Sequence, residues 1–168
     1  IPSIIYGLFG MLFFVTAIKW GYSILAGSFT LAIMVLPTII RSTEEALLAV
    51  DDSYREGSFG LGAGKLRTVF VIVLPSAASG ILSGIILSIG RIVGETAALI
   101  YTAGTVAKIP ESVLDSARTM SIHMYSLSRE GLHTGEASAT AVILLVTVLL
   151  LNTIAEMIAR RFAARQGA

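Results

Sequence analysis

Arg91 and Glu95 are the residues of this sequence that could bind a charged ligand or exchange a proton with it. They directly follow residues 68–90, a stretch that carries no charge. If a helix begins near Pro75, where proline suits the first turn, Arg91 lies about 22 Å along it from Ser76 and well inside a hydrocarbon layer. Residues four apart share a helix face. A guanidinium can bind an oxyanion through paired hydrogen bonds, and a neighbouring carboxylate could accept a proton from the anion or balance the arginine in the empty state.

Two interpretations of this pair are open. A charge within a membrane is costly, and by default it marks either a transport pathway or a buried ion pair. In the first interpretation Arg91, Glu95 and the adjacent Thr96 line a substrate pathway. In the second, the arginine and the glutamate only fix the packing of helices.

No other pattern indicates catalysis or metal binding. The chain has no Cys, and its two histidines, His123 and His133, have no acidic cluster beside them, so we expect each at a surface or an interface. The glycines and lysine of residues 60–65 are similar to a phosphate loop, but Phe59 and Leu66 stand where that loop needs Gly and Ser or Thr. We expect no catalytic residue, no metal and no cofactor.

The composition indicates a membrane protein. The 168 residues are 55% hydrophobic and 14% charged, whereas a soluble domain carries about 25% charged residues. The net charge of +1 does not suggest nucleic-acid binding. We predict an all-α polytopic fold, with residues 1–168 forming a single transmembrane domain in a lipid bilayer. Since a span needs roughly 20 apolar residues, we expect four spans, at about residues 2–18, 23–40, 76–103 and 137–159.

The positions of Lys and Arg predict the orientation of these spans. Seven of these cations lie within residues 41–67 and 160–168, and four lie on the opposite side of the predicted membrane. We therefore expect residues 41–67 and the C-terminus to be cytoplasmic and residues 104–135 to be external.

Small residues recur at every fourth position in the third predicted span, at Ser76, Gly80, Gly84 and Ser88. Such a stripe lets a second helix approach closely. We therefore predict a helix-packing face that leads directly towards Arg91.

The connection between the second and third spans, residues 41–67, is longer than a bare link requires. Residues 42–48 open like a helix, with a hydroxyl cap at Ser42 followed by acidic residues. Gly62 can take a positive φ and so turn one short helix into the next. We predict a bent, water-facing helical elbow that leads into the span at Pro75.

The spacing of Glu56, Gly62 and Ile72-x-Leu74-Pro75 resembles the EAA loop of ATP-binding-cassette (ABC) importer permeases, whose fold is called MetI-like. The resemblance implies that the loop forms a coupling helix, which docks into a groove of a cytoplasmic ATPase. By position, this role falls on Glu56, Gly57, Ser58, Gly62 and Ala63. Gly57 and Ser58 replace the usual alanines, and Gly57 weakens the helix by about 1 kcal/mol relative to Ala.

The stretch from Gly90 to Ala97 resembles a signature of the phosphate-specific transport permeases, and so do residues 2–8, 36–41, 122–125 and 130–133. The resemblance implies a six-span subunit in a bacterial inner membrane. The first two spans would then be missing here, in keeping with a start at Ile1 without an initiator Met. It also implies a related permease as heterodimer partner, two copies of an ATPase, an external phosphate-binding protein, and inorganic phosphate as substrate.

Three rival functions are open. A permease of the same family could carry sulfate, molybdate or phosphonate, although the Arg-x-x-x-Glu signature argues against it. A membrane assembly protein without a pathway would not need the long cytoplasmic elbow. An ion-driven carrier typically shows inverted repeats, and the sequence contains no internal repeat. We favour a channel-forming subunit that performs no chemistry itself and couples a partner's ATP hydrolysis to phosphate import.

Overall fold

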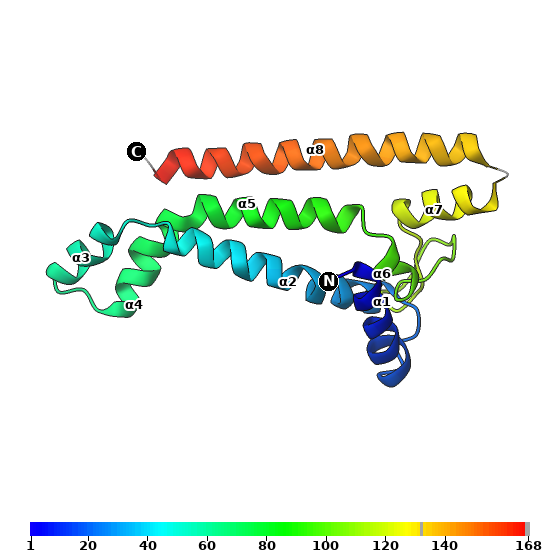
Figure 1. Cartoon of the computed structure of the whole chain (residues 1–168), viewed down its shortest axis with the longest axis horizontal. Helices are drawn as coiled ribbons and strands as arrows, with labels where there is room; N and C mark the ends of the chain where they lie inside the picture. The colour runs from blue at the N-terminus through cyan, green and yellow to red at the C-terminus, as the bar shows by residue number, and fades with distance from the viewer. Residues whose placement is uncertain (132, 167–168) are drawn as a thin grey trace. The chain divides into compact units, whose positions relative to one another are not determined.

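A computed structural model describes residues 1–131 and 133–166, without the side chains of Glu130 and residues 162–166. Leu132 of the predicted external loop and residues 167–168 of the predicted cytoplasmic tail lie outside the described residues. Within them the chain is helical and contains no strand, which confirms the all-α prediction. The helices follow in this order (Figure 1): α1 (Ser3–Gly10), η1 (Met11–Ala17), α2 (Ile24–Leu48), α3 (Asp52–Gly60), α4 (Lys65–Thr68), η2 (Val69–Val73), α5 (Leu74–Val93), α6 (Ala97–Ile100), α7 (Met120–Glu130) and α8 (Thr134–Gln166).

Three helices in the described part of the chain are long and apolar enough to cross a membrane: Ile24–Leu48, Lys65–Val93 and Thr134–Arg161. The apolar helix Ser3–Ala17, which consists of α1 and the π-helical η1, is shorter. At 1.5 Å per residue it measures about 22 Å, against about 30 Å of hydrocarbon. The chain is a multi-pass membrane protein, and the first of the four predicted spans is a shorter helix than the other three.

Helix α2 does not end at Arg41, where the sequence predicted the second span to stop. It continues to Leu48 with Pro37 inside it. The side chains of Arg41 and Glu45 lie 3.6 Å apart, one turn from each other on this helix. The prediction that Ser42 caps a new helix is therefore wrong, because the helix-favouring residues that follow extend the existing one.

The third long helix begins earlier and ends earlier than the sequence predicted. α4, η2 and α5 form one continuous helix from Lys65 to Val93, so the predicted start at Pro75 and end near Ala103 are both wrong. Proline lacks an N–H, and its ring clashes with the carbonyl four residues earlier in an α-helix. The π-helical turn η2 lies directly before Pro75 and widens the helix where that clash would occur.

The described chain groups into two compact units, residues 1–36 with 90–150, and residues 37–89 with those from 151 onward. In the second unit α5 packs closely on the last turns of α2. A Cβ added at Gly80 would lie 2.7 Å from the Cβ of Ala46, and one added at Gly84 would overlap Ser42. Beside this crossing, three apolar side chains form a buried cluster: Val50, Val73 and Ala77.

The two serines of the predicted packing stripe differ in their environments. Ser88 is buried, and its hydroxyl donates to the Gly84 carbonyl at 3.0 Å. Ser76 is exposed, and its hydroxyl donates to the Ile72 carbonyl at 2.8 Å. The close helix approach in this unit therefore depends on the glycines in the middle of the stripe.

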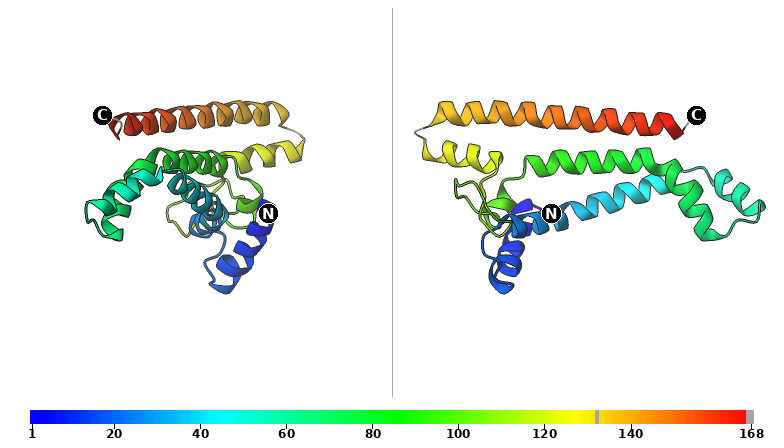
Figure 2. Two further views of the ribbon diagram at one scale, coloured as in Figure 1. Left: turned by 60° about the vertical axis from the view of Figure 1, so that its left-hand side comes forward. Right: turned by 180° about the vertical axis from the view of Figure 1, so that it is seen from behind.

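In the first unit α6 and the residues after it lie against α1 and α2 (Figure 2). A Cβ at Gly7 would lie 2.8 Å from the Cα of Ala98, so α1 approaches the α6 backbone directly. Gly10 lies against the side chains of Thr30 and Thr102 in the same way. Bulky side chains at these two glycines would force α1 away from its neighbours.

The segment 104–119 is held against the start of α2 by backbone hydrogen bonds. The N–H groups of Ile24 and Leu25 donate to the carbonyls of Asp115 (3.0 Å) and Val113 (2.9 Å). These bonds satisfy N–H groups that a helix start leaves without intrahelical partners. Hydrogen bonds from the backbone N–H groups of Glu111 and Ser112 lower the pKa of the Asp115 carboxyl.

The contact between Gly84 and Ser42 yields a size-swap prediction. Gly84→Ala introduces a methyl group where Ser42 already fills the space, and overpacking of this kind costs about 1–3 kcal/mol. Thermal unfolding of the full-length subunit in detergent should occur at a lower temperature. Ser42→Gly combined with Gly84→Ala removes the opposing side chain and should recover much of the loss. Gly135→Ala, where no atom lies within 4 Å of the added Cβ, is the control. An unchanged unfolding temperature in Gly84→Ala would refute the close contact.

Candidate functional site: a helix break and a helical elbow

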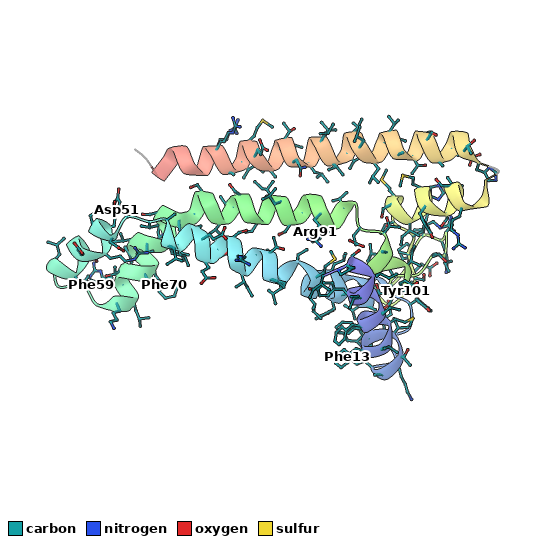
Figure 3. The ribbon with its side chains drawn as sticks, viewed as in Figure 1. Phe13, Asp51, Phe59, Phe70, Arg91 and Tyr101 are labelled. Carbon is teal, nitrogen blue, oxygen red and sulfur yellow. The ribbon has the colours of Figure 1, made fainter. Side chains whose placement is uncertain are left out.

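Arg91 lies in the last turn of α5 and its side chain is exposed (Figure 3). It forms no ion pair with any carboxylate whose side chain the structure describes. A cation in the last turn of a helix interacts favourably with the negative end of the helix dipole. The helix dipole therefore favours the positive charge of Arg91, and the described carboxylates leave its guanidinium available to an anion.

Glu95 does not share a helix face with Arg91, because the helix ends at Val93 and the next one, α6, begins at Ala97. The carboxylate Oε1 of Glu95 instead accepts from the backbone N–H of Ala98 at 3.1 Å. The prediction of a helical Arg–Glu pair is wrong, because Gly94 interrupts the helix between them.

Two further hydrogen bonds hold the helix break in place. The Ser121 hydroxyl of α7 donates to the Glu95 carbonyl at 2.8 Å. The Thr96 hydroxyl donates to the Gly94 carbonyl at 3.4 Å, so Thr96 participates in the turn itself. In this structure Glu95 caps α6 and ties the break to α7.

The helix boundaries also change the expected depth of Arg91. With a helix start at Lys65, the uncharged residues 68–90 provide about 33 Å of helix before the arginine. This length matches the roughly 30 Å of a bilayer's hydrocarbon core. Arg91 then lies at the far end of the span from the elbow and not at its middle.

The predicted elbow consists of α3 and α4, which project beyond the ends of α2 and α5 (Figure 1). Arg55 of α3 donates to the carbonyls of Leu47 at 2.7 Å and Val50 at 2.8 Å, and so caps the end of α2. Asp51 begins α3 by accepting from the Ser53 N–H at 2.8 Å, and hydrogen bonding by Ser53 lowers the pKa of this carboxyl. Both ends of the connection between α2 and α3 are thereby fixed.

The two short helices of the elbow are joined by polar contacts and by a left-handed glycine. The hydroxyls of Ser58 and Thr68, both buried, lie 2.8 Å apart. Gly62 has φ of 81°, the positive φ that its position predicted. The Ala63 N–H closes the turn by donating to the Ser58 carbonyl at 3.1 Å. Ser58, Gly62 and Ala63 thus set the angle of the elbow.

The outer surface of the elbow exposes apolar side chains. Leu61, directly before the glycine turn, is 91% exposed. Phe59 and Phe70, labelled in Figure 3, are also exposed, as are Glu56 and Gly57 of α3. A helical hairpin that is held by its own hydrogen bonds and exposes a leucine to solvent has the features of a docking element.

Sequence reasoning missed several residues that shape these two features. The bond between Ser58 and Thr68 has no local sequence signal, because the partners are ten residues apart. Arg55 could have been found from its spacing to Asp52, with which it forms an ion pair at 2.6 Å. Leu61 carried a signal too, as an apolar residue between two glycines in a segment predicted to face water.

The histidines lie in or near α7 and the start of α8. His123 Nδ1 lies 3.4 Å from Arg118 Nη1, and His133 Nδ1 lies 3.2 Å from Glu136 Oε1. Among the described residues no group of three or more His, Asp or Glu side chains could hold a metal ion.

Three membrane-length apolar helices and an exposed helical elbow, all within the described residues, define a multi-pass membrane protein. A family model described as "Binding-protein-dependent transport system inner membrane component" matches residues 1–167, and the chain belongs to this family. The predicted permease family is thereby confirmed, and with it the prediction of a transporter component rather than an enzyme.

Individual relatives agree with the family. The chain is 34% identical over 168 residues to the "Probable ABC transporter permease protein YqgI" of Bacillus subtilis, with 90% of this chain and 57% of that protein covered. It is 36% identical over 159 residues to the "Phosphate transport system permease protein PstA" of Yersinia pestis, with 94% of this chain and 54% of that protein covered. It is 44% identical over 102 residues to the protein of the same name from Pasteurella multocida, with 61% of this chain and 36% of that protein covered. The chain therefore spans about half, or less, of the length of these relatives. No solved structure gives a significant match.

Arg91 and Glu95 now have separate expected phenotypes. If Arg91 lines a transport pathway, Arg91→Gln in the full-length subunit should abolish substrate uptake while the protein still accumulates in the membrane, because no described carboxylate loses a partner. Arg91→Lys should be impaired as well, since lysine lacks the planar guanidinium that forms paired hydrogen bonds with an oxyanion. Glu95→Gln keeps an oxygen for the Ala98 N–H, whereas Glu95→Leu removes the cap at a cost of about 1 kcal/mol.

Uptake and membrane abundance of the full-length subunit, measured on the same cells, check these expectations. Normal uptake by Arg91→Gln would contradict a pathway role for the arginine. Restored uptake in the double variant Arg91→Leu with Glu95→Leu would show that the two residues act only as a structural pair.

Proposed function

We propose that this chain is part of the channel-forming permease subunit of an ATP-driven inorganic phosphate importer. In this proposal a partner ATPase hydrolyses ATP, the elbow transmits the resulting movement to the membrane helices, and phosphate crosses beside them. The partners would be a dimer of the ATPase, a related second permease, and an external phosphate-binding protein. Residues 41–67, which include the last turns of α2 and most of the elbow, and the C-terminus would be cytoplasmic, and residues 104–135 would be external.

The observation that carries the proposal is the elbow between two membrane-length helices. Leu61 is 91% exposed at the tip, while Arg55, Ser58 and Thr68 hold the hairpin together from inside. A hydrophobic side chain on a rigid support gains free energy when a partner's groove removes it from water, by about 1.5–3 kcal/mol for a leucine. Glu56 and Gly57 are exposed on α3, where they could contact the same partner.

Phosphate is supported as the substrate by chemistry and by relatives. A guanidinium forms paired hydrogen bonds with phosphate oxygens, and Arg91 has no described carboxylate partner that would compete. Several relatives carry the printed name of phosphate transport system permease protein PstA. Competition of phosphate uptake by sulfate or molybdate would indicate another oxyanion instead.

Leu61→Asp tests whether the elbow docks on an ATPase. The charge should be strongly disfavoured in an apolar groove, so ATPase co-purification and phosphate uptake should both fall by at least about tenfold, which corresponds to 1.4 kcal/mol. Ile109→Asp is the matched control, because Ile109 is 86% exposed and lies in the segment proposed to be external. The measurement is the amount of ATPase retained on the purified full-length subunit, together with uptake in cells.

Two results would contradict this proposal. Wild-type ATPase retention and uptake in Leu61→Asp would remove the elbow tip from the docking surface. An equal loss in Ile109→Asp would show that an exposed charge harms the subunit in general and that Leu61 has no special role.

A further inference from the structure

A cavity of about 400 Å³ lies in the first compact unit. The end of α6, the segment after it and α7 contribute its lining, which consists of Ile100, Thr105, Arg118, Tyr125, Ser126 and Arg129. Two of these six residues are arginines, and no carboxylate is among the described lining residues. The described lining therefore carries two positive charges and no negative one.

Arg118 is fixed in position by neutral acceptors. Its Nε–H donates to the Thr105 carbonyl at 2.7 Å, and Nη1 lies 3.4 Å from His123 Nδ1. The side chain is only partly exposed. Two of its five N–H groups are thus used in holding the guanidinium, and the other three are available to a ligand.

Arg129 is placed by an aromatic ring instead. Its guanidinium carbon lies 5.9 Å from the centre of the Tyr125 ring, within the range of a cation–π contact. Neither Arg129 nor Arg118 forms an ion pair with a carboxylate described in the structure. Two guanidiniums that face one cavity repel each other, and an anion between them would remove that repulsion.

We propose that this cavity is a second anion site, in which Arg118 and Arg129 bind a phosphate-type oxyanion. Two planar guanidiniums suit the tetrahedral oxygens of such an anion, and Tyr125, which carries a hydroxyl donor, is part of the same lining. The volume far exceeds that of one phosphate, so water would share the cavity. A use of this site in phosphate import rests on the proposed function, whereas the binding itself does not.

The binding can be measured without transport. Ser126→Cys places a thiol in the lining of a segment that has no native cysteine. The full-length subunit, in the assembled transporter with other reactive cysteines replaced, is placed in phosphatidylcholine nanodiscs. Reaction rates are compared for an anionic sulfonate thiosulfonate reagent and its cationic trimethylammonium counterpart. We expect the ratio of anionic to cationic rates to exceed that of a free thiol, and inorganic phosphate to slow the anionic reagent.

The arginine variants decide the assignment. Removing the unit charge in Arg129→Gln should slow the anionic reagent about fivefold and speed the cationic one about fivefold, the effect of one charge at about 4 Å in water, so the rate ratio should fall about 25-fold. Protection by phosphate should be abolished. Arg118→Gln should have the same two effects, but it also removes the hydrogen bond to the Thr105 carbonyl. If Arg118→Gln fails to fold for that reason, Arg129→Gln alone tests the binding. Lys108→Gln removes a cation from the same segment outside the cavity lining and should change neither quantity.

Three outcomes would overturn the proposal. The first is no protection by about 10 mM inorganic phosphate, far above the micromolar to millimolar range of ordinary ligand sites. The second is an equal effect of Lys108→Gln, which would indicate a diffuse positive surface. The third is protection that requires phosphatidylglycerol in the nanodisc and does not respond to inorganic phosphate, which would assign the cavity to a lipid headgroup. Because no step uses ATP or uptake, a failure here leaves the proposed import function untouched.

Discussion

The continuous helix from Lys65 to Val93 is the constraint on which the rest of this structure depends. Its first turns form one arm of the elbow, and its last turn carries Arg91. Before Pro75 the π turn η2, which ends at Val73, widens the helix where the proline ring would otherwise clash with the backbone. One hydrogen-bonded element therefore joins the surface proposed to meet an ATPase with the residue proposed to meet phosphate.

The two ends of this helix are stabilised in different ways. At the elbow, polar groups point inward, as with the buried Ser58 and Thr68 hydroxyls, while the apolar Leu61 is left outside. At the other end, Glu95 and Ser121 satisfy the backbone of the helix break, and the Arg91 side chain is left exposed. In both places the groups that could satisfy one another locally do so. What remains exposed is a group of apolar side chains that includes Leu61 at one end and the cationic Arg91 at the other, each suited to a separate partner.

The sequence predicted the fold class, the elbow and the positive φ of Gly62, because these follow from composition, loop length and glycine's missing Cβ. It failed at helix boundaries. Pro75 and Arg41 were expected to start and stop helices, yet both lie within longer ones, since tertiary packing and neighbouring helix formers outweigh a single residue. The predicted Arg91–Glu95 pair failed for a related reason, because spacing of four residues means proximity only in an unbroken helix. The cavity of Arg118 and Arg129 was not predictable, since it requires α6, α7 and the intervening segment to be folded together.

The central claim is that the elbow contacts an ATPase on the cytoplasmic side, and a photo-crosslinking amino acid at position 61 tests it most directly. The full-length subunit with p-benzoylphenylalanine in place of Leu61 is irradiated in the assembled transporter, and the crosslinked partner is identified by mass spectrometry. The same amino acid in place of Ile109, which is similarly exposed, marks the opposite side of the proposed topology. We expect a crosslink from position 61 to the ATPase and none from position 109. A crosslink from position 61 only to lipid or to an external protein, or one from position 109 to the ATPase, would contradict it.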